Sequence, residues 1–173
     1  MAIRTMDELF IHGLQDVYYA ENQILKTLPE MMEKSSDPML REGFKLHLEE
    51  TREQIKRLDQ VFRALGQPPK GVTCQAVLGL IEEGQEVVGQ IDDKDLRDAA
   101  IIGSAQAIEH YEINRYGTLI AWAQQLGHRE TVEGNQLGNV EIVDLLQLSL
   151  DEEKNIDRKL TALAESRVNR HAA

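Results

Sequence analysis

Residues 10–28 read FIHGLQDVYYAENQILKTL, and apolar side chains recur there at the three- and four-residue spacing of one helix face. The positions on that face are Phe10, Leu14, Val17, Glu21, Ile24 and Leu28. Five of these six positions are apolar, and the other is a carboxylate in the middle of the stripe. The stretch therefore predicts a long amphipathic helix that carries one acid on its inner face.

The composition narrows the class of protein. The chain has 173 residues, a formal net charge of −11 and a single cysteine. This length suits one domain, residues 1–173, with its own core. An acidic surface repels nucleic-acid phosphates and anionic lipid headgroups, so we expect neither nucleic acid nor a membrane as a partner. No disulfide can form within the chain, and no apolar run is long enough for a signal peptide or a membrane span, so the expected location is the cytoplasm.

Apolar spacing and capping residues predict an all-α protein. The expected long helices cover about residues 5–35, 38–65, 94–126 and 141–168, and a shorter helix at about residues 74–91 lies between the second and the third. Gly66 and Gly127 should end two of the helices, whereas Pro29 should kink or shorten the first. A break is expected around Gly134 and Gly138. Long helices with short connections favour a four-helix bundle, to which the short helix is added.

The first and third long helices align without a gap, and this internal repeat places Glu21 on Glu112. A fainter repeat lays residues 48–58 of the second helix on residues 150–160 of the fourth, and it places Glu50 on Glu152. Each long helix thus offers a carboxylate near its inner face. Ionised acids that are buried close together repel one another, so either some of them are protonated or a divalent cation lies between them.

A carboxylate-bridged di-metal site in a bundle takes one Glu from each of two helices and a Glu-x-x-His pair from each of the other two. The candidate ligands are Glu21, Glu50, Glu53, Glu109, Glu112 and Glu152. Glu53 follows Glu50 by three residues, and Asn155 follows Glu152 by three, so neither imidazole of the pattern is present. Such an oxygen-rich site suits manganese, magnesium or calcium at least as well as iron.

Two of the helix faces stay open to a second interpretation. Thr51 fits the apolar stripe of the second helix better than Glu50 does, and Glu153 competes with Glu152 for the inner face of the fourth. His47 and His110 lie on helices near the proposed site, but about one turn out of register. Asp157 could orient a ligand or pair with a surface cation.

Several strings resemble the YciE/YciF family of bacterial stress proteins. They include TMDELFIHGLQDVYYAENQ at residues 5–23, HLEETREQI at 47–55, RDAAII at 97–102, QLGH at 125–128 and LDEEK at 150–154. Residues 151–157, DEEKNID, are similar to the fourth-helix D-E-E-x-H-I-D pattern of bacterioferritin-type proteins, with Asn155 in the place of the His. The segment between His128 and about Leu148 is longer than the family pattern. The resemblance implies a ferritin-like bundle that is dimeric and cytoplasmic.

Two functions are compatible with these observations. The first is a metal-binding stress protein with a carboxylate-rich di-metal site, with iron as the expected metal, manganese as the alternative, and chemistry on oxygen or peroxide. The second is a non-catalytic, homodimeric structural protein in which that site has degenerated. The register of the four Glu residues favours the first function, and the missing imidazoles favour the second. Protection of DNA is disfavoured because the chain is acidic and has no basic tail.

Overall fold

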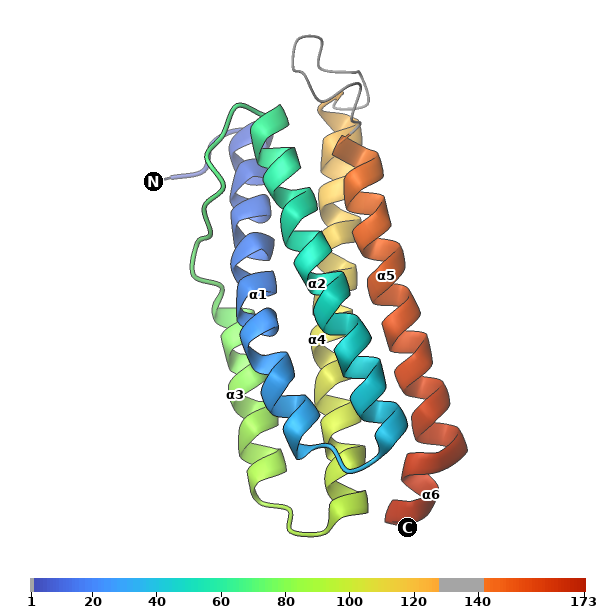
Figure 1. Cartoon of the computed structure of the whole chain (residues 1–173). Coiled ribbons are helices and arrows are strands. Elements are labelled where there is room, and N and C mark those ends of the chain that lie inside the picture. The colour runs from blue at the N-terminus through green and yellow to red at the C-terminus, as the bar shows by residue number, and fades with distance from the viewer. Residues whose placement is uncertain (1, 128–141) are drawn as a thin grey trace.

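The computed structural model describes residues 2–127 and 142–173, and within these ranges it contains helices and no strand (Figure 1). The helices are α1 (Met6–Lys34), α2 (Pro38–Ala64), α3 (Gln75–Gly89), α4 (Lys94–Gln125) and α5 (Ile142–Leu163), followed by the π-helical turn η1 (Ala164–Val168) and the short α6 (Asn169–Ala172). The predicted all-α class is confirmed. The predicted break at Gly134 and Gly138 lies outside the described residues.

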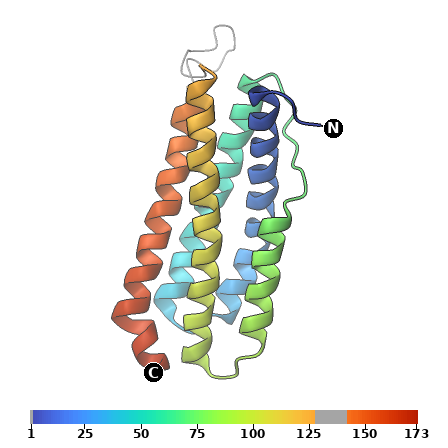
Figure 2. The ribbon, with the colours of Figure 1, turned by 180° about the vertical axis from the view of Figure 1, so that it is seen from behind.

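The four long helices form the bundle. Each packs against two neighbours in the order α1, α2, α5, α4, and neighbouring helices run antiparallel (Figures 1 and 2). The chain leaves α2 at one end of the bundle and returns along its outside, through residues 65–74 and α3, before α4 begins at the other end. α3 packs mainly on α4 and also touches α1. One long crossover of this kind is the connectivity of ferritin-like bundles.

Buried positions follow one another at alternating four- and three-residue steps in the long helices, as in coiled-coil packing. The series are Phe10, Leu14, Val17, Glu21, Ile24 and Leu28 in α1, Leu40, Phe44, His47, Thr51, Gln54 and Leu58 in α2, Asp98, Ile101, Ala105, Ile108 and Glu112 in α4, and Ile142, Leu146, Ser149, Glu153, Ile156 and Leu160 in α5. Side chains from all four helices therefore meet in successive layers along the bundle.

The apolar core is divided into two clusters. One contains Leu28, Phe44 and Ile101, and the other contains Phe10, Phe62 and Leu119. Positions of α1, α2, α4 and α5 that lie between the two clusters carry polar side chains. Apolar side chains thus lie on both sides of a polar middle layer along the bundle.

The helix ends follow the local sequence. Thr5 forms a capping box with Glu8 at the start of α1, and Asp37 caps α2 by accepting from the Met39 N–H at 2.7 Å. Gly66 and Gly127 follow α2 and α4 with φ angles of 66° and 78°, which favour glycine. Pro29 lies inside α1 and does not end it. Among the described residues, no helix is long and apolar enough to cross a membrane.

Asp98, in the first turns of α4, ties the α1–α2 turn to the bundle. Its carboxylate is 2% exposed and accepts hydrogen bonds from the Ser36 and Asp37 N–H groups at 2.8 and 2.7 Å. Arg167 of η1 forms an ion pair with Asp37 from the other side. One buried acid therefore satisfies two backbone donors that have no helical partner.

Asp98→Ala removes both of these charge-assisted hydrogen bonds and leaves one buried and one half-buried N–H group unsatisfied. We expect the free energy of unfolding in urea to fall by about 2–4 kcal/mol. Asp92→Ala is the matched control, because Asp92 is exposed just before α4, and it should change the stability by less than about 0.5 kcal/mol. Equal effects of the two substitutions would contradict the structural role of Asp98.

Candidate metal centre

The polar middle layer consists of side chains from all four long helices. They are Glu21 of α1, His47, Thr51 and Gln54 of α2, Glu109 and Glu112 of α4, and Glu153 of α5, and each is at most 2% exposed. Four carboxyl groups thus lie away from water in the middle of the bundle. We refer to this set of seven residues as the polar layer.

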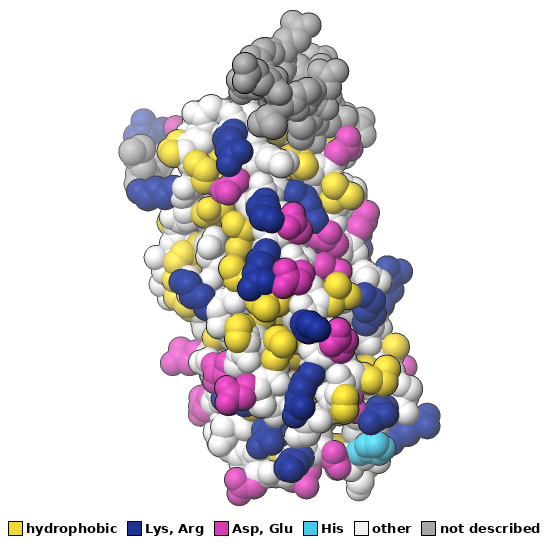
Figure 3. Space-filling view, in the orientation of Figure 1, with side chains coloured by type: hydrophobic (Ala, Val, Ile, Leu, Met, Phe, Trp, Pro, Cys, Tyr) yellow, Lys and Arg dark blue, Asp and Glu magenta, His cyan; other side chains and the backbone are white. Residues whose placement is uncertain are grey.

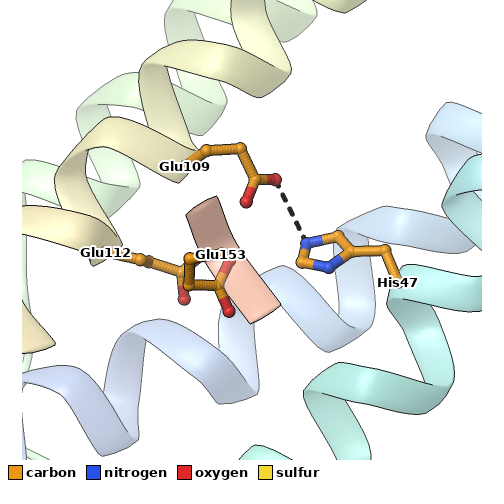
Figure 4. A group of neighbouring side chains, drawn as sticks. All are labelled: His47, Glu109, Glu112 and Glu153. Carbon is orange, nitrogen blue, oxygen red and sulfur yellow. Dashed lines mark ion pairs between the residues drawn. The ribbon is translucent and has the colours of Figure 1, made fainter. Parts of the chain in front are cut away.

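Four members of the polar layer converge on one point. His47, Glu109, Glu112 and Glu153 each offer a nitrogen or carboxylate oxygen, and these atoms all lie within 4.8 Å of one another (Figure 4). The His47 Nε2 is 3.2 Å from the Glu109 Oε1, although the geometry is not that of a hydrogen bond. Glu and His donors at such mutual distances could hold a divalent cation.

Two of the four acids accept a side-chain hydrogen bond through one carboxylate oxygen only. The Tyr116 hydroxyl donates to the Glu21 Oε1, and the Gln54 amide donates to the Glu153 Oε1. The same Gln54 amide nitrogen donates to the Glu152 Oε2 at 3.1 Å. These contacts fix the orientation of each carboxylate and leave its second oxygen pointing elsewhere.

Several polar atoms of the layer have no hydrogen-bond partner among the described residues. They are both oxygens of Glu112, the Oε2 atoms of Glu21, Glu109 and Glu153, the Oε1 of Gln54 and both ring nitrogens of His47. A buried carboxylate oxygen without a partner is costly, and nearly all such atoms in proteins are paired. The presence of several unpaired oxygen and nitrogen atoms at one buried place therefore needs an explanation.

Burial and mutual repulsion raise the pKa values of all four acids. Burial is the main cause, and it raises the pKa of Glu21 and of Glu109 to about 8. The pKa values of Glu112 and Glu153 lie well above their ordinary value, again because of burial first and then the charges of neighbouring carboxylates. Near neutral pH, the layer therefore either retains protons or requires a cation.

Comparison with known proteins places the chain in a family. Residues 5–173 match the family described as a domain of unknown function, DUF892. The chain belongs to the DUF892 family. Protein YciF of Escherichia coli (strain K12) is 42% identical over 173 residues, which cover 99% of this chain and 98% of that protein. The resemblance to the YciE/YciF stress proteins is thereby confirmed.

Solved structures share the fold of this DUF892 chain. The crystal structure of the E. coli stress protein YciF superposes with a TM-score of 0.86 over 96% of this chain and 99% of that one, at 42% identity. YcfI from Rhodopseudomonas palustris, provisionally described as a structural protein, is 52% identical, with a TM-score of 0.84 over 92% and 94% of the two chains. A protein from Xanthomonas campestris pv. campestris, 20% identical, has a TM-score of 0.70 over 95% and 94%.

The structure brings three of the six predicted ligands into the polar layer, namely Glu21, Glu109 and Glu112. Glu50 is half-buried at its edge, and burial raises the pKa of its carboxyl group. The other two lie outside the layer. Glu53 is exposed and lies 2.6 Å from the Lys56 Nζ, whereas Glu152 is half-buried and forms an ion pair with Arg57. Metal binding by these residues stays a prediction.

His47 and Glu153 also belong to the layer, although His47 was expected to be about one turn out of register and Glu153 was left open as the rival of Glu152. Glu153, rather than its neighbour Glu152, faces the core. A strict alternation of four- and three-residue steps from Phe44 leads to His47, and the same steps from Leu146 lead to Glu153. This signal was present in the sequence, but apolar spacing alone passes over polar members of a core series.

The inner positions of the two halves of the internal repeat do not carry the same residues. The alignment of residues 48–58 with 150–160 places Thr51 on Glu153, and its extension by one residue places His47 on Ser149. The alignment of the other two helices places Tyr18 on Glu109. Within the polar layer, only Glu21 and Glu112 are aligned as two carboxylates.

The raised pKa values predict how stability depends on pH in the metal-free protein. Because the folded acids bind protons more tightly than the unfolded ones, stability should be highest at acidic pH and fall as pH rises from about 5 to about 8. Thermal unfolding in the presence of a chelator measures this effect. Glu112→Gln, which carries no titratable group at that position, should flatten the dependence, and a melting temperature that rises over the same range would contradict the assignment.

Proposed function

We propose that the polar layer binds divalent metal ions, with iron as the expected metal and manganese as the alternative. The observation that carries this proposal is the convergence of unpaired, buried Glu and His atoms from different helices on one point. A cation would pair with these atoms and offset the repulsion between the carboxylates.

The donor chemistry indicates which metals fit. His47, Glu109, Glu112 and Glu153 would hold one ion, and the free oxygen of Glu21 would serve a second ion beside it. One imidazole among carboxylates suits iron or manganese better than the softer ions that prefer thiolates. Bound iron or manganese would supply electrons for reactions with oxygen or peroxide, a chemistry that agrees with the description of the E. coli relative as a stress protein.

The surroundings of the layer would support such a centre. The Tyr116 and Gln54 contacts orient Glu21 and Glu153, and the apolar clusters on both sides exclude water. Tyr116 is fully buried, and burial raises the pKa of its hydroxyl well above the ordinary value, so it remains a hydrogen-bond donor to Glu21. The carboxylates would therefore need little reorganisation when an ion binds.

A non-catalytic role is the alternative, in which the protein is a homodimeric structural protein and any metal serves stability. The provisional description of YcfI as a structural protein favours it. The presence of a single imidazole in the layer also favours it. Oxygen consumption or peroxide loss by the iron-loaded protein separates the two functions, because only the first predicts turnover.

Elemental analysis of protein purified without added metal or chelator tests the proposed site. We expect up to two iron or manganese ions per chain, and Glu112→Ala and Glu153→Ala should each abolish binding. Glu53→Ala is the matched control, since that carboxylate is exposed and should leave the metal content unchanged.

Metal added at about 100 times its Kd should also raise the stability of the chelated protein by about 2.7 kcal/mol. Absence of metal from the wild type, together with no change in melting temperature on adding Fe(II) or Mn(II), would refute the site.

A further inference from the structure

The seam between α4 and α5 carries a second group of potential metal ligands, closer to the surface than the polar layer. Asp157 of α5 accepts a hydrogen bond from the Gln106 Nε2 at 2.9 Å, and its Oδ1 lies 3.3 Å from the His110 Nε2. The side chain of His110 is 69% exposed and that of Asp157 is 19% exposed. An imidazole and a carboxylate thus face each other at the border between solvent and the bundle.

These two residues adjoin the polar layer through both helices. Asp157 follows Glu153 by four residues, so the two carboxylates lie on the same side of α5, one turn apart. His110 directly follows Glu109 in α4, and the charge of Asp157 is close enough to Glu109 to raise the pKa of that acid. Glu109 is 2% exposed, and its Oε2 has no hydrogen-bond partner among the described residues. His110, Asp157 and Glu109 therefore form a series of decreasing exposure that ends in the layer.

The seam on the other side of α5 is unfavourable for a cation. There, between α2 and α5, the Arg57 guanidinium donates to the Ser149 hydroxyl at 2.8 Å and to the Glu152 carboxylate at 2.9 Å. Burial raises the pKa of Glu50, and Lys159 lies close enough to oppose part of this rise. The α2–α5 seam thus holds cations beside its carboxylates, in keeping with the mixture of Lys, Arg, Asp and Glu side chains on this face of the molecule (Figure 3), whereas the α4–α5 seam offers a carboxylate and an imidazole. The seam between α1 and α4 is partly covered by α3, which packs on both helices.

We propose that His110 and Asp157 form a surface site that receives a divalent cation and passes it between α4 and α5 to Glu109. This inference rests on the proposed function, because the polar layer is the destination of the ion. The hydrogen bond from Gln106, which also donates to the Thr161 hydroxyl at 2.8 Å, holds the Asp157 carboxylate at the seam. The negative charge of the Asp157 carboxylate attracts cations to this seam, which raises their local concentration and their association rate.

Stopped-flow absorbance of Co(II) binding to the chelator-treated, full-length protein tests the transfer role. Asp157→Asn should slow Co(II) loading about tenfold at low salt and weaken its dependence on ionic strength. Release of Co(II) should slow as well, because a residue on the route affects ions that leave the polar layer as well as ions that enter it. The number of Co(II) ions bound at equilibrium should stay at the wild-type value.

Asp151→Asn is the matched control. Asp151 is exposed on the same helix, and this substitution removes the same charge, so its loading rate should equal that of the wild type. His110→Gln provides a second test on a mostly exposed residue, where misfolding is not expected, and it should also slow loading. Circular dichroism verifies the fold of each variant.

The outcomes separate this inference from the proposed function. Wild-type loading rates in both the Asp157 and the His110 variants would overturn the transfer route while leaving the metal centre intact. A lower number of bound ions in Asp157→Asn would make Asp157 a permanent ligand and would also overturn the route. Failure of the wild-type protein to bind Co(II), Fe(II) or Mn(II) would overturn both proposals.

Discussion

The crowding of four carboxyl groups in a water-free layer is the constraint on which the rest of this structure depends. The apolar clusters on either side give the bundle its stability, but they also remove the water that would otherwise screen these acids. Gln54 and Tyr116 each satisfy one oxygen, which is not enough for the set. The layer is therefore stable only when protons or a cation compensate the negative charge.

Protons and metal ions compete for the same oxygens in such a layer. The metal-free layer keeps its protons near neutral pH because burial and repulsion raise the pKa values of its acids. Binding of a cation would release those protons, so apparent metal affinity and pH would be linked. This linkage follows from the burial of the acids and is independent of any turnover. It would operate in a redox centre and in a purely structural metal site alike.

The bundle and three of the seven residues of the polar layer were predictable from the sequence. A single acid interrupts an otherwise apolar stripe at Glu21 and at Glu112, and Glu109 lies one turn before Glu112. The adjacent acids Glu152 and Glu153 posed a harder problem, since a shift of one residue changes which of them faces inward. Which of the two faces inward depends on side-chain packing at about 3.5 residues per turn along the whole bundle. This is a property of the four helices together, and the apolar spacing within one helix does not reveal it. His47 was missed for the same reason. The segment from residue 128 to residue 141 lies outside the described part of the chain.

The non-equivalence of the two repeat halves has a consequence for how the layer would fill. With Thr51 where the other half has Glu153, and Ser149 where it has His47, a pair of ions would have unlike donor sets. The ion next to His47 and Glu109 would be bound by an imidazole and several carboxylates, whereas the ion next to Glu21 would have fewer donors. Occupancy would then proceed in a fixed order, and the singly loaded protein would be one defined species with its own reduction potential.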